Sequence, residues 1–227
     1  MINIYNKFFD AKHLPKGAIF DLDGTLVDTE KVVFEMWPKA AKQLGVEVSD
    51  EAMLAVVGKN ENLSRDILHK MYGESYPYDE SLEVLIEMIY TEYAETGVPE
   101  KPGLHELFAF FKNLGLKMGV ASSSDIKLLE WKLERSDFAE YFHSVTAGDE
   151  VEHSKPHPDI FLTELDKLGL KADEVVGFED APAGVEALIA AKIPAVFVKD
   201  LLDIPKDLKQ LLFAEVSTLD EAIQLFN

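Results

Sequence analysis

The sequence contains no cysteine, which excludes disulfide bonds and metal sites built on thiolates. Positive charge is scarce, since 22 Lys and Arg residues stand against 42 Asp and Glu residues, and the formal net charge is -20 at pH 7. Such a balance disfavours nucleic acids, whose phosphates require cationic side chains, and anionic membrane surfaces. We therefore expect no nucleic acid and no membrane among the partners of this protein.

Long apolar runs are missing as well. No stretch approaches the ~20 apolar residues that a membrane-spanning helix needs. Residues 1–16 lack the continuous apolar segment of a signal peptide, and no pattern assigns them a structure. A cytoplasmic protein, monomeric or weakly self-associating, is the expectation.

Short apolar runs, by contrast, recur along the chain with helical patterns between them. Strands that are almost entirely apolar and alternate with helices predict a parallel sheet covered on both faces, the doubly wound α/β fold with a Rossmann-like core. The helical pattern that ends at Gly169 has a natural C-cap there. The predicted strands are residues 17–22, 116–122, 142–148, 174–180, 194–199 and 213–217.

One long segment, residues 30–98, breaks this alternation because it shows helical patterns and no convincing strand. We expect a small all-helical domain inserted into a core domain formed by 17–29 and 99–227. Pro38 is predicted to interrupt the first helix, and Ser49 is predicted to be the N-cap of the second.

The stretch "AIFDLDGTLVDTE" places two carboxylates, Asp21 and Asp23, at the end of the first core strand. In an extended chain both side chains point to the same side of the strand. Two carboxylates facing one point share either a proton or a cation, and Asp oxygens suit Mg²⁺. A polar turn after the strand is the open alternative.

Polar residues also follow three later strands. "GVASSSD" supplies Ser122 and Ser123, "HSKPHPDIF" supplies Lys155, and "GFEDAPAG" supplies Glu179 and Asp180. Each could be an ordinary turn, a solvated lysine or an acidic helix cap. Ligands of open parallel sheets bind at the carboxyl ends of the strands, so the joint occurrence of these residues favours one site.

In order and spacing, "DLDGTLVDT", "ASSS", "SKPHPDIF" and "GFEDAPAG" resemble the four motifs of the haloacid dehalogenase superfamily of phosphotransferases. The resemblance implies that Asp21 is the nucleophile that attacks phosphorus and that Asp23 is the acid and then the base. It implies that Ser122 and Lys155 contact the phosphate, with Ser123 beside them. It further implies a Mg²⁺ ion, whose expected ligands are Asp21, the backbone carbonyl of Asp23, Asp180 and, directly or through water, Glu179.

The helical insertion resembles the cap of that family, and "FEDAPAGVEA" and "KPHPDIF" resemble members that act on small sugar, polyol or nucleoside phosphates. In such relatives a loop between cap helices selects the substrate, and the matching residues here are Gly58, Lys59 and Asn60. An ordinary helix connection is the alternative for this loop.

A phosphatase is the favoured function and a phosphomutase is the closest competitor. Relatives of the β-phosphoglucomutase type carry a His where this chain has Val33, and an Arg in the cap loop where it reads "GKNEN". A dehalogenase does not need Asp23 as an acid. A signalling receiver domain also uses a phosphorylated Asp, but it is shorter and lacks the helical insertion. A non-catalytic phospho-acceptor or binding protein is a remote alternative, because the full set of four motifs argues against it.

Overall fold

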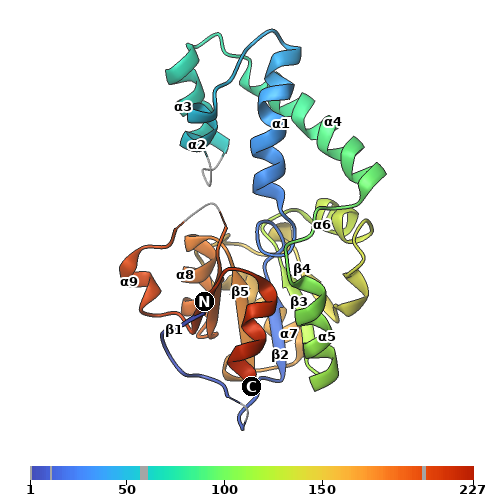
Figure 1. The fold of residues 1–227 in the computed structure, drawn as a ribbon, viewed down its shortest axis with the longest axis vertical. Coiled ribbons are helices and arrows are strands. Elements are labelled where there is room, and N and C mark those ends of the chain that lie inside the picture. Colours follow the sequence, from blue (N-terminus) through green and yellow to red (C-terminus); the bar gives the residue numbers. More distant parts are fainter. Residues whose placement is uncertain (1, 11, 57–60, 201–202) are drawn as a thin grey trace. The chain divides into compact units, whose positions relative to one another are not determined.

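Within the residues that the computed structural model describes, which are all except 1, 11, 57–60 and 201–202, the chain forms one seven-stranded sheet (Figure 1). The six apolar runs that were predicted to be strands contain β2 to β7. The strands are β1 (Asn3–Ile4), β2 (Gly17–Phe20), β3 (Lys117–Ala121), β4 (Ser144–Thr146), β5 (Val175–Glu179), β6 (Ala195–Val198) and β7 (Ala214–Val216).

The strand order in the sheet is β1-β7-β6-β5-β2-β3-β4. Strands β2 to β7 pair in parallel and β1 pairs antiparallel with β7, so the predicted doubly wound sheet is confirmed with one antiparallel edge strand added. The chain builds β2, β3 and β4 in one direction and then returns to the other side of β2 with β5. The order reverses between β2 and β5, and in open sheets this is where a crevice opens at the carboxyl ends of the strands.

The chain divides into two compact units, which we call the core unit (Met1–Val27 with Glu100–Asn227) and the helical unit (Asp28–Pro99). The function of these units as core and cap domains stays a prediction. The helices of the core unit are α5 (Leu104–Leu114), α6 (Ile126–Leu133), α7 (Asp159–Leu168), α8 (Pro182–Ala190) and α9 (Lys206–Lys209). Its 3₁₀ helices are η1 (Ala139–Tyr141), η2 (Gly148–Glu150), η3 (Ala172–Glu174) and η4 (Leu219–Phe226).

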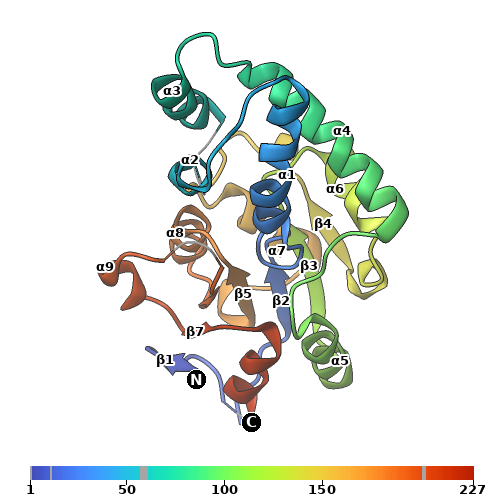
Figure 2. The same cartoon turned by 45° about the horizontal axis from the view of Figure 1, so that its top comes forward.

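Successive residues of β2 point to opposite faces of the sheet and enter different hydrophobic cores. Ile19 joins an aliphatic cluster with residues of α7 and α8, including Leu165 and Leu188. Phe20 stacks on Phe178 with ring centroids 4.7 Å apart and lies 5.0 Å from Phe108 of α5. Helices therefore cover both faces (Figure 2), which explains why the strands are apolar throughout.

The helical unit consists of α1 (Thr29–Gln43), α2 (Asp50–Val56), α3 (Glu61–Tyr72) and α4 (Tyr78–Thr96), and its described residues form no strand. Trp37, Met53 and Leu68 are part of its buried core, and the Trp37 indole N–H donates to the Tyr76 hydroxyl at 2.8 Å. Ser49 caps α2 as predicted, because its Oγ accepts from the Ala52 N–H at 3.2 Å. No helix among the described residues is long and apolar enough to cross a membrane.

The predicted interruption at Pro38 is wrong, because α1 runs through Pro38 without a break. Proline removes one backbone donor and crowds the preceding turn, at a cost of about 3 kcal/mol. Trp37, Ala40 and Ala41 on either side of it are all buried. Packing of this helix face offsets the local cost, which a reading of propensity alone does not include.

The N-terminal segment, for which the sequence predicts no structure, packs against the outer edge of the sheet. Beside the pairing of β1 with β7, the Asn6 amide donates to the carbonyls of Gln210 and Leu212 at 2.9 and 2.7 Å. Phe9 is buried and its ring centroid lies 5.9 Å from that of Phe213. The segment thus covers an edge strand that would otherwise present unpaired backbone groups.

Glu164 of α7 is a charged residue in the interior of the core unit. Its Oε1 accepts from the Ser144 hydroxyl and its Oε2 from the Thr146 hydroxyl at 2.7 Å, which ties α7 to β4. Gly119 of β3 makes room for it, since a Cβ there would lie 2.0 Å from Glu164 Oε1. Burial raises the pKa of Glu164 above its usual value, although the two hydroxyls oppose the shift.

We expect Glu164→Gln to stabilise the protein near neutral pH and to flatten the dependence of its unfolding free energy on pH. The pKa of Glu164 is about 4.5 in the unfolded chain and higher in the folded protein. Protonated Glu164 therefore contributes its full stability below about pH 4.5, and this contribution is lost as the pH rises through the folded pKa. Chemical denaturation of both proteins from pH 4.5 to pH 8 measures this.

The difference in unfolding free energy between Glu164→Gln and the parent should increase with pH. The exposed Glu152→Gln should show no such trend. Glu164→Ala should instead cost about 1–3 kcal/mol at every pH, because the buried Thr146 hydroxyl loses its partner. A gap between Glu164→Gln and parent that stays constant over this range would contradict the assignment.

Candidate active site

Asp21 lies directly beyond β2, at the point where the strand order reverses. Its backbone N–H donates to the Phe178 carbonyl of β5 at 3.0 Å. The pairing of β2 with β5 therefore continues to Asp21 and fixes the position of its backbone. The residue is only 6% exposed. A buried carboxylate without partners is costly, and the surrounding loops supply them.

Lys155, in the loop that precedes α7, provides the positive charge. Its Nζ donates to Asp21 Oδ1 at 2.5 Å, to Glu179 Oε1 at 2.8 Å and to the Ala121 carbonyl at 3.0 Å. These three bonds use all three hydrogens of the ammonium group. Because the side chain is 7% exposed, Lys155 lies between two carboxylates with little access for water.

Glu179 and Asp180, at the end of β5, complete the cluster. Asp180 Oδ1 accepts from the Thr25 hydroxyl at 2.8 Å, and Glu179 Oε2 accepts from the Ala181 N–H at 2.9 Å. Gly24 has a φ of +88°, and a Cβ there would lie 2.2 Å from Asp180 Oδ2. A glycine is therefore required in this turn both for its conformation and for the space that it leaves.

One carboxylate oxygen each from Asp21, Glu179 and Asp180 can lie within 4.8 Å of the other two, the one group of this kind in the described part of the chain. Three buried carboxylates fit a hard divalent cation that takes oxygen ligands, as Mg²⁺ does. The donor set agrees with the metal predicted from the sequence, and the ligand roles of these residues stay a prediction.

The electrostatics of the protein alone point the same way. Burial raises the pKa of Asp21 to about 8; Lys155 opposes this shift, while Glu179 and Asp23 add to it. Burial also raises the pKa of Asp180, with Glu179 and Asp21 adding to the shift. Burial by itself would lower the pKa of Lys155, but Asp21 and Glu179 outweigh it and raise it. One ammonium does not neutralise three carboxylates, and a bound divalent cation would.

Asp23 belongs to the same loop as Asp21 but has different partners. Lys132 of α6 donates from Nζ to Asp23 Oδ1, and the Ser124 hydroxyl donates to Asp23 Oδ2 at 3.0 Å. The Asp23 side chain is 30% exposed, far more than that of Asp21 at 9%. The two carboxylates therefore lie in different environments, since Asp21 is nearly enclosed and Asp23 is partly exposed.

A cavity of about 410 Å³ opens at this edge of the sheet. Ser122 is fully buried after β3, where its Oγ accepts from the Ser124 N–H at 3.1 Å, and it does not line the cavity. Its predicted contact with phosphate, like that of Ser123, stays a prediction. The lining residues are Asp21, Asp23, Ser123, Ser124, Lys155, Glu179, Asp180, Ala181, Ala183 and Gly184.

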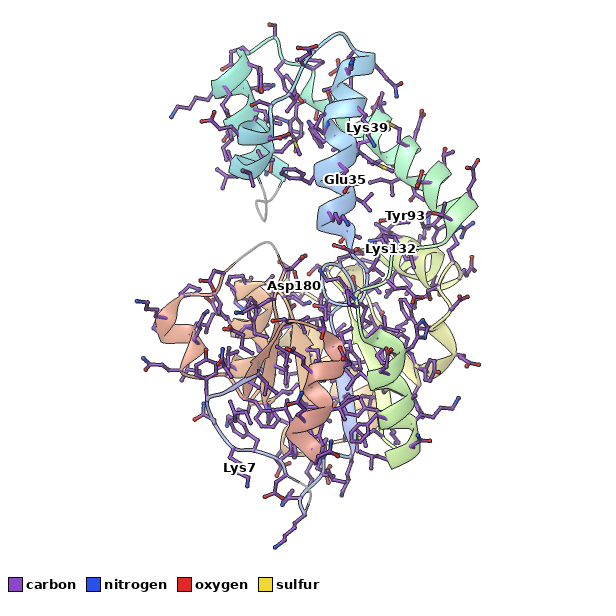
Figure 3. The ribbon with its side chains drawn as sticks, viewed as in Figure 1. Lys7, Glu35, Lys39, Tyr93, Lys132 and Asp180 are labelled. Atoms are coloured by element: carbon purple, nitrogen blue, oxygen red, sulfur yellow. The ribbon has the colours of Figure 1, made fainter. Side chains whose placement is uncertain are left out.

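Lys132, Ser124 and Thr25 were not found from the sequence. Lys132 has a signal there, because it lies one position before Leu133 and three after Leu129 on the buried face of α6. A lysine on an apolar helix face needs a buried anion as its partner. Figure 3 labels Lys132 and Asp180, which come from α6 and from the end of β5. The predicted substrate residues Gly58, Lys59 and Asn60 lie outside the described residues.

Comparison with known proteins identifies the family of this chain. A family model described as haloacid dehalogenase-like hydrolase matches residues 18–198. The chain belongs to this family. A phosphorylated carbohydrates phosphatase of Thermotoga maritima is 31% identical over 186 residues, which cover 80% of this chain and 84% of the relative. Hexitol phosphatase B of Escherichia coli is 31% identical over 188 residues, which cover 80% of this chain and 82% of the relative.

Solved structures agree with this assignment. A Thermotoga maritima structure described as a candidate β-phosphoglucomutase has a TM-score of 0.79 and 28% identity, and the match covers 92% of this chain and 97% of that one. The resemblance to the haloacid dehalogenase superfamily is therefore confirmed. This chain is an enzyme, a phosphomonoester hydrolase of the haloacid dehalogenase type.

We expect Lys155→Met to destabilise the protein by about 3–5 kcal/mol in the absence of divalent cations, because it leaves Asp21 and Glu179 buried without their counter-charge. Lys167→Met is the matched control, since Lys167 pairs with Glu150 at 2.7 Å with both side chains about one-third exposed. Exposed pairs contribute about 0–1 kcal/mol. Urea denaturation in EDTA measures both, and equal losses would contradict the role of Lys155 in the cluster.

Proposed function

We propose that this enzyme is a Mg²⁺-dependent phosphatase that hydrolyses a small phosphorylated metabolite through a phosphate ester of Asp21. A sugar, polyol or nucleoside phosphate is the proposed substrate class. The names of two relatives, a phosphorylated carbohydrates phosphatase and a hexitol phosphatase, support a sugar or polyol phosphate. A cytoplasmic protein, monomeric or weakly self-associating, remains part of this proposal.

In the proposed first half-reaction a carboxylate oxygen of Asp21 attacks phosphorus while the bond from phosphorus to the leaving oxygen breaks. Asp23 gives its proton to that oxygen, and the alcohol departs. Lys155 is held 2.5 Å from Asp21 Oδ1, where its charge offsets the approach of an anionic phosphate to a carboxylate. Mg²⁺ held by Asp21, Asp180, Glu179 and the Asp23 carbonyl would neutralise phosphate charge.

In the proposed second half-reaction water attacks the phosphorus of the aspartyl-phosphate and the bond to Asp21 breaks. Asp23, now a carboxylate, takes a proton from the water. One ester and one water become one alcohol and one phosphate, and both Asp side chains return to their starting states. One residue can serve both steps, because the second transfers a proton in the reverse direction.

The observation that carries this proposal is the position of Asp21. It is the one carboxylate that follows β2, faces the cavity, accepts from Lys155 and belongs to the group of three acids that suits a cation, all among the described residues. A purely structural carboxylate does not need a cavity on one side and excess negative charge on the other.

Asp21→Asn should lower phosphatase turnover by at least about 10³-fold without changing the fold, because an amide oxygen is a poor nucleophile. Release of inorganic phosphate from a panel of sugar and polyol phosphates measures the rate. Acid-quenched parent enzyme should carry covalent phosphate and the variant none.

The exposed Asp173→Asn is the matched control and should keep full activity. Asp21→Asn activity as high as a tenth of the parent would exclude the nucleophile assignment. A parent that binds phosphate esters but never releases phosphate would support the remote alternative of a binding protein.

The mutase alternative is disfavoured by Val33. This residue packs against the hydrophobic core of the helical unit, at the position where the mutase relatives carry a His. An apolar side chain there can neither donate nor accept a proton. A mutase would convert one sugar phosphate into its isomer and would require a bisphosphate, whereas a phosphatase releases phosphate from the start.

Residues 30–98 are proposed to act as the cap, with Gly58, Lys59 and Asn60 contacting the leaving group. This proposal rests on the resemblance of the insertion to family caps and on the helical composition of the unit. Replacement of Lys59 by Ala would then change the ranking of substrates more than the rate on p-nitrophenyl phosphate.

EDTA should abolish activity and Mg²⁺ should restore it. Mg²⁺ should also raise the melting temperature, because a ligand that binds only the folded state stabilises it and the cation relieves repulsion among three buried carboxylates. Asp180→Asn, which removes one of these charges, should reduce the Mg²⁺-dependent rise and weaken Mg²⁺ activation. An enzyme indifferent to chelation would contradict the proposed metal.

A further inference from the structure

Lys132 lies on the buried face of α6, where apolar side chains are normally found. It is 7% exposed and shares its helix face with Leu129 and Leu133. A lysine is rarely buried so completely unless it is paired, because an ammonium group loses its hydration there. The partner therefore indicates what this residue does.

That partner is Asp23. Lys132 donates to Asp23 Oδ1 and Ser124 to Asp23 Oδ2, so each carboxylate oxygen accepts a bond from a different element. Asp21, by contrast, is held by Lys155. Each of the two carboxylates in the "DLDG" loop thus has its own lysine, Lys155 for Asp21 and Lys132 for Asp23.

Lys132 does not line the cavity, whereas Asp23 and Ser124 do. The cavity-lining residue to which Lys132 donates is Asp23. Lys132 is therefore not placed as a phosphate ligand, and its effect on a reaction would be exerted on the position of Asp23.

We propose that Lys132 is a positioning residue that fixes Oδ1 of Asp23 and leaves Oδ2 as the oxygen that carries the proton. The inference rests on the proposed function, in which Asp23 is acid and base. In the first half-reaction Oδ2 gives its proton to the leaving oxygen, and in the second it takes one from water. The Ser124 hydroxyl can both donate and accept, so it serves Oδ2 in either state, whereas the ammonium can only donate.

The consequence is a dependence on the leaving group. An alkyl alcohol must be protonated as it departs, whereas p-nitrophenolate leaves without a proton. The ratio kcat/KM covers the steps up to departure of the alcohol, so it isolates the first half-reaction. A misplaced Asp23 should therefore lower kcat/KM for an alkyl phosphate and spare p-nitrophenyl phosphate.

The test compares Lys132→Met, Lys132→Arg and Asp23→Asn on sorbitol 6-phosphate, or on glucose 6-phosphate if that is the better substrate, and on p-nitrophenyl phosphate. Lys132→Met should lower kcat/KM about 10²-fold on the alkyl ester, the order that a misplacement of about 1 Å costs, and less than about threefold on p-nitrophenyl phosphate. Lys132→Arg should recover part of the loss. The exposed Lys127→Met, on the same helix, is the control and should change neither.

Asp23→Asn should show the same selectivity, and the double variant Asp23→Asn with Lys132→Met should be no worse on the alkyl ester than Asp23→Asn alone. Equal losses on both esters, or a loss that follows a fall in melting temperature, would reduce Lys132 to a structural role. If Lys132→Met does not fold, Lys132→Gln decides by the same ratio of the two esters.

The two levels of the proposal fail differently. If Asp23→Asn does not distinguish the esters, the acid role of Asp23 is wrong and this inference falls with it. If Asp23→Asn distinguishes them and the Lys132 variants do not, the proposed function stands and only the role of Lys132 is overturned.

Discussion

An excess of buried negative charge lies where β2 and β5 end, and much of the core unit is arranged around it. Asp21 and Glu179 both pair with the ammonium of Lys155, and an oxygen of Asp180 lies within 4.8 Å of theirs. The Thr25 hydroxyl and the Ala181 N–H satisfy further carboxylate oxygens. These contacts reduce the cost of burial without removing the charge, and the remaining charge would favour a bound cation, as we propose.

The topology of the sheet explains why the charge gathers at this point. β2 and β5 are neighbours in space although β5 begins at Val175, which lies 154 positions after Asp21 in the chain. They pair in parallel with Phe20 opposite Phe178, so Asp21 and Glu179 leave the sheet at the same level. A ligand placed there is reached by two loops at once, and neither loop has to cross the sheet.

The sequence predicted those parts of the molecule in which local pattern and tertiary structure agree. The six core strands, the C-cap at Gly169 and the acidic strand ends are of this kind. Pro38 was misjudged because tertiary packing outweighs the local cost of proline, and the N-terminal segment because its partner, β7, lies some 200 residues away. Lys132 was missed because its anion comes from a distant loop, and a helical pattern does not show which loop that is.

In the proposed mechanism, the pairing of two carboxylates with two lysines would give the nucleophile and the acid–base residue different environments. A nucleophile must be close to the phosphate and shielded from water, which suits the enclosed Asp21 beside Lys155. A residue that gives and takes a proton must face the leaving group and the water that follows it, which suits Asp23 with its side chain 30% exposed. The spacing of two residues allows both because β2 ends at Phe20 and the turn at Gly24 directs the chain away from the strand. The three residues between the strand end and Gly24 thus place both carboxylates on the cavity, with Asp21 nearly enclosed and Asp23 more exposed.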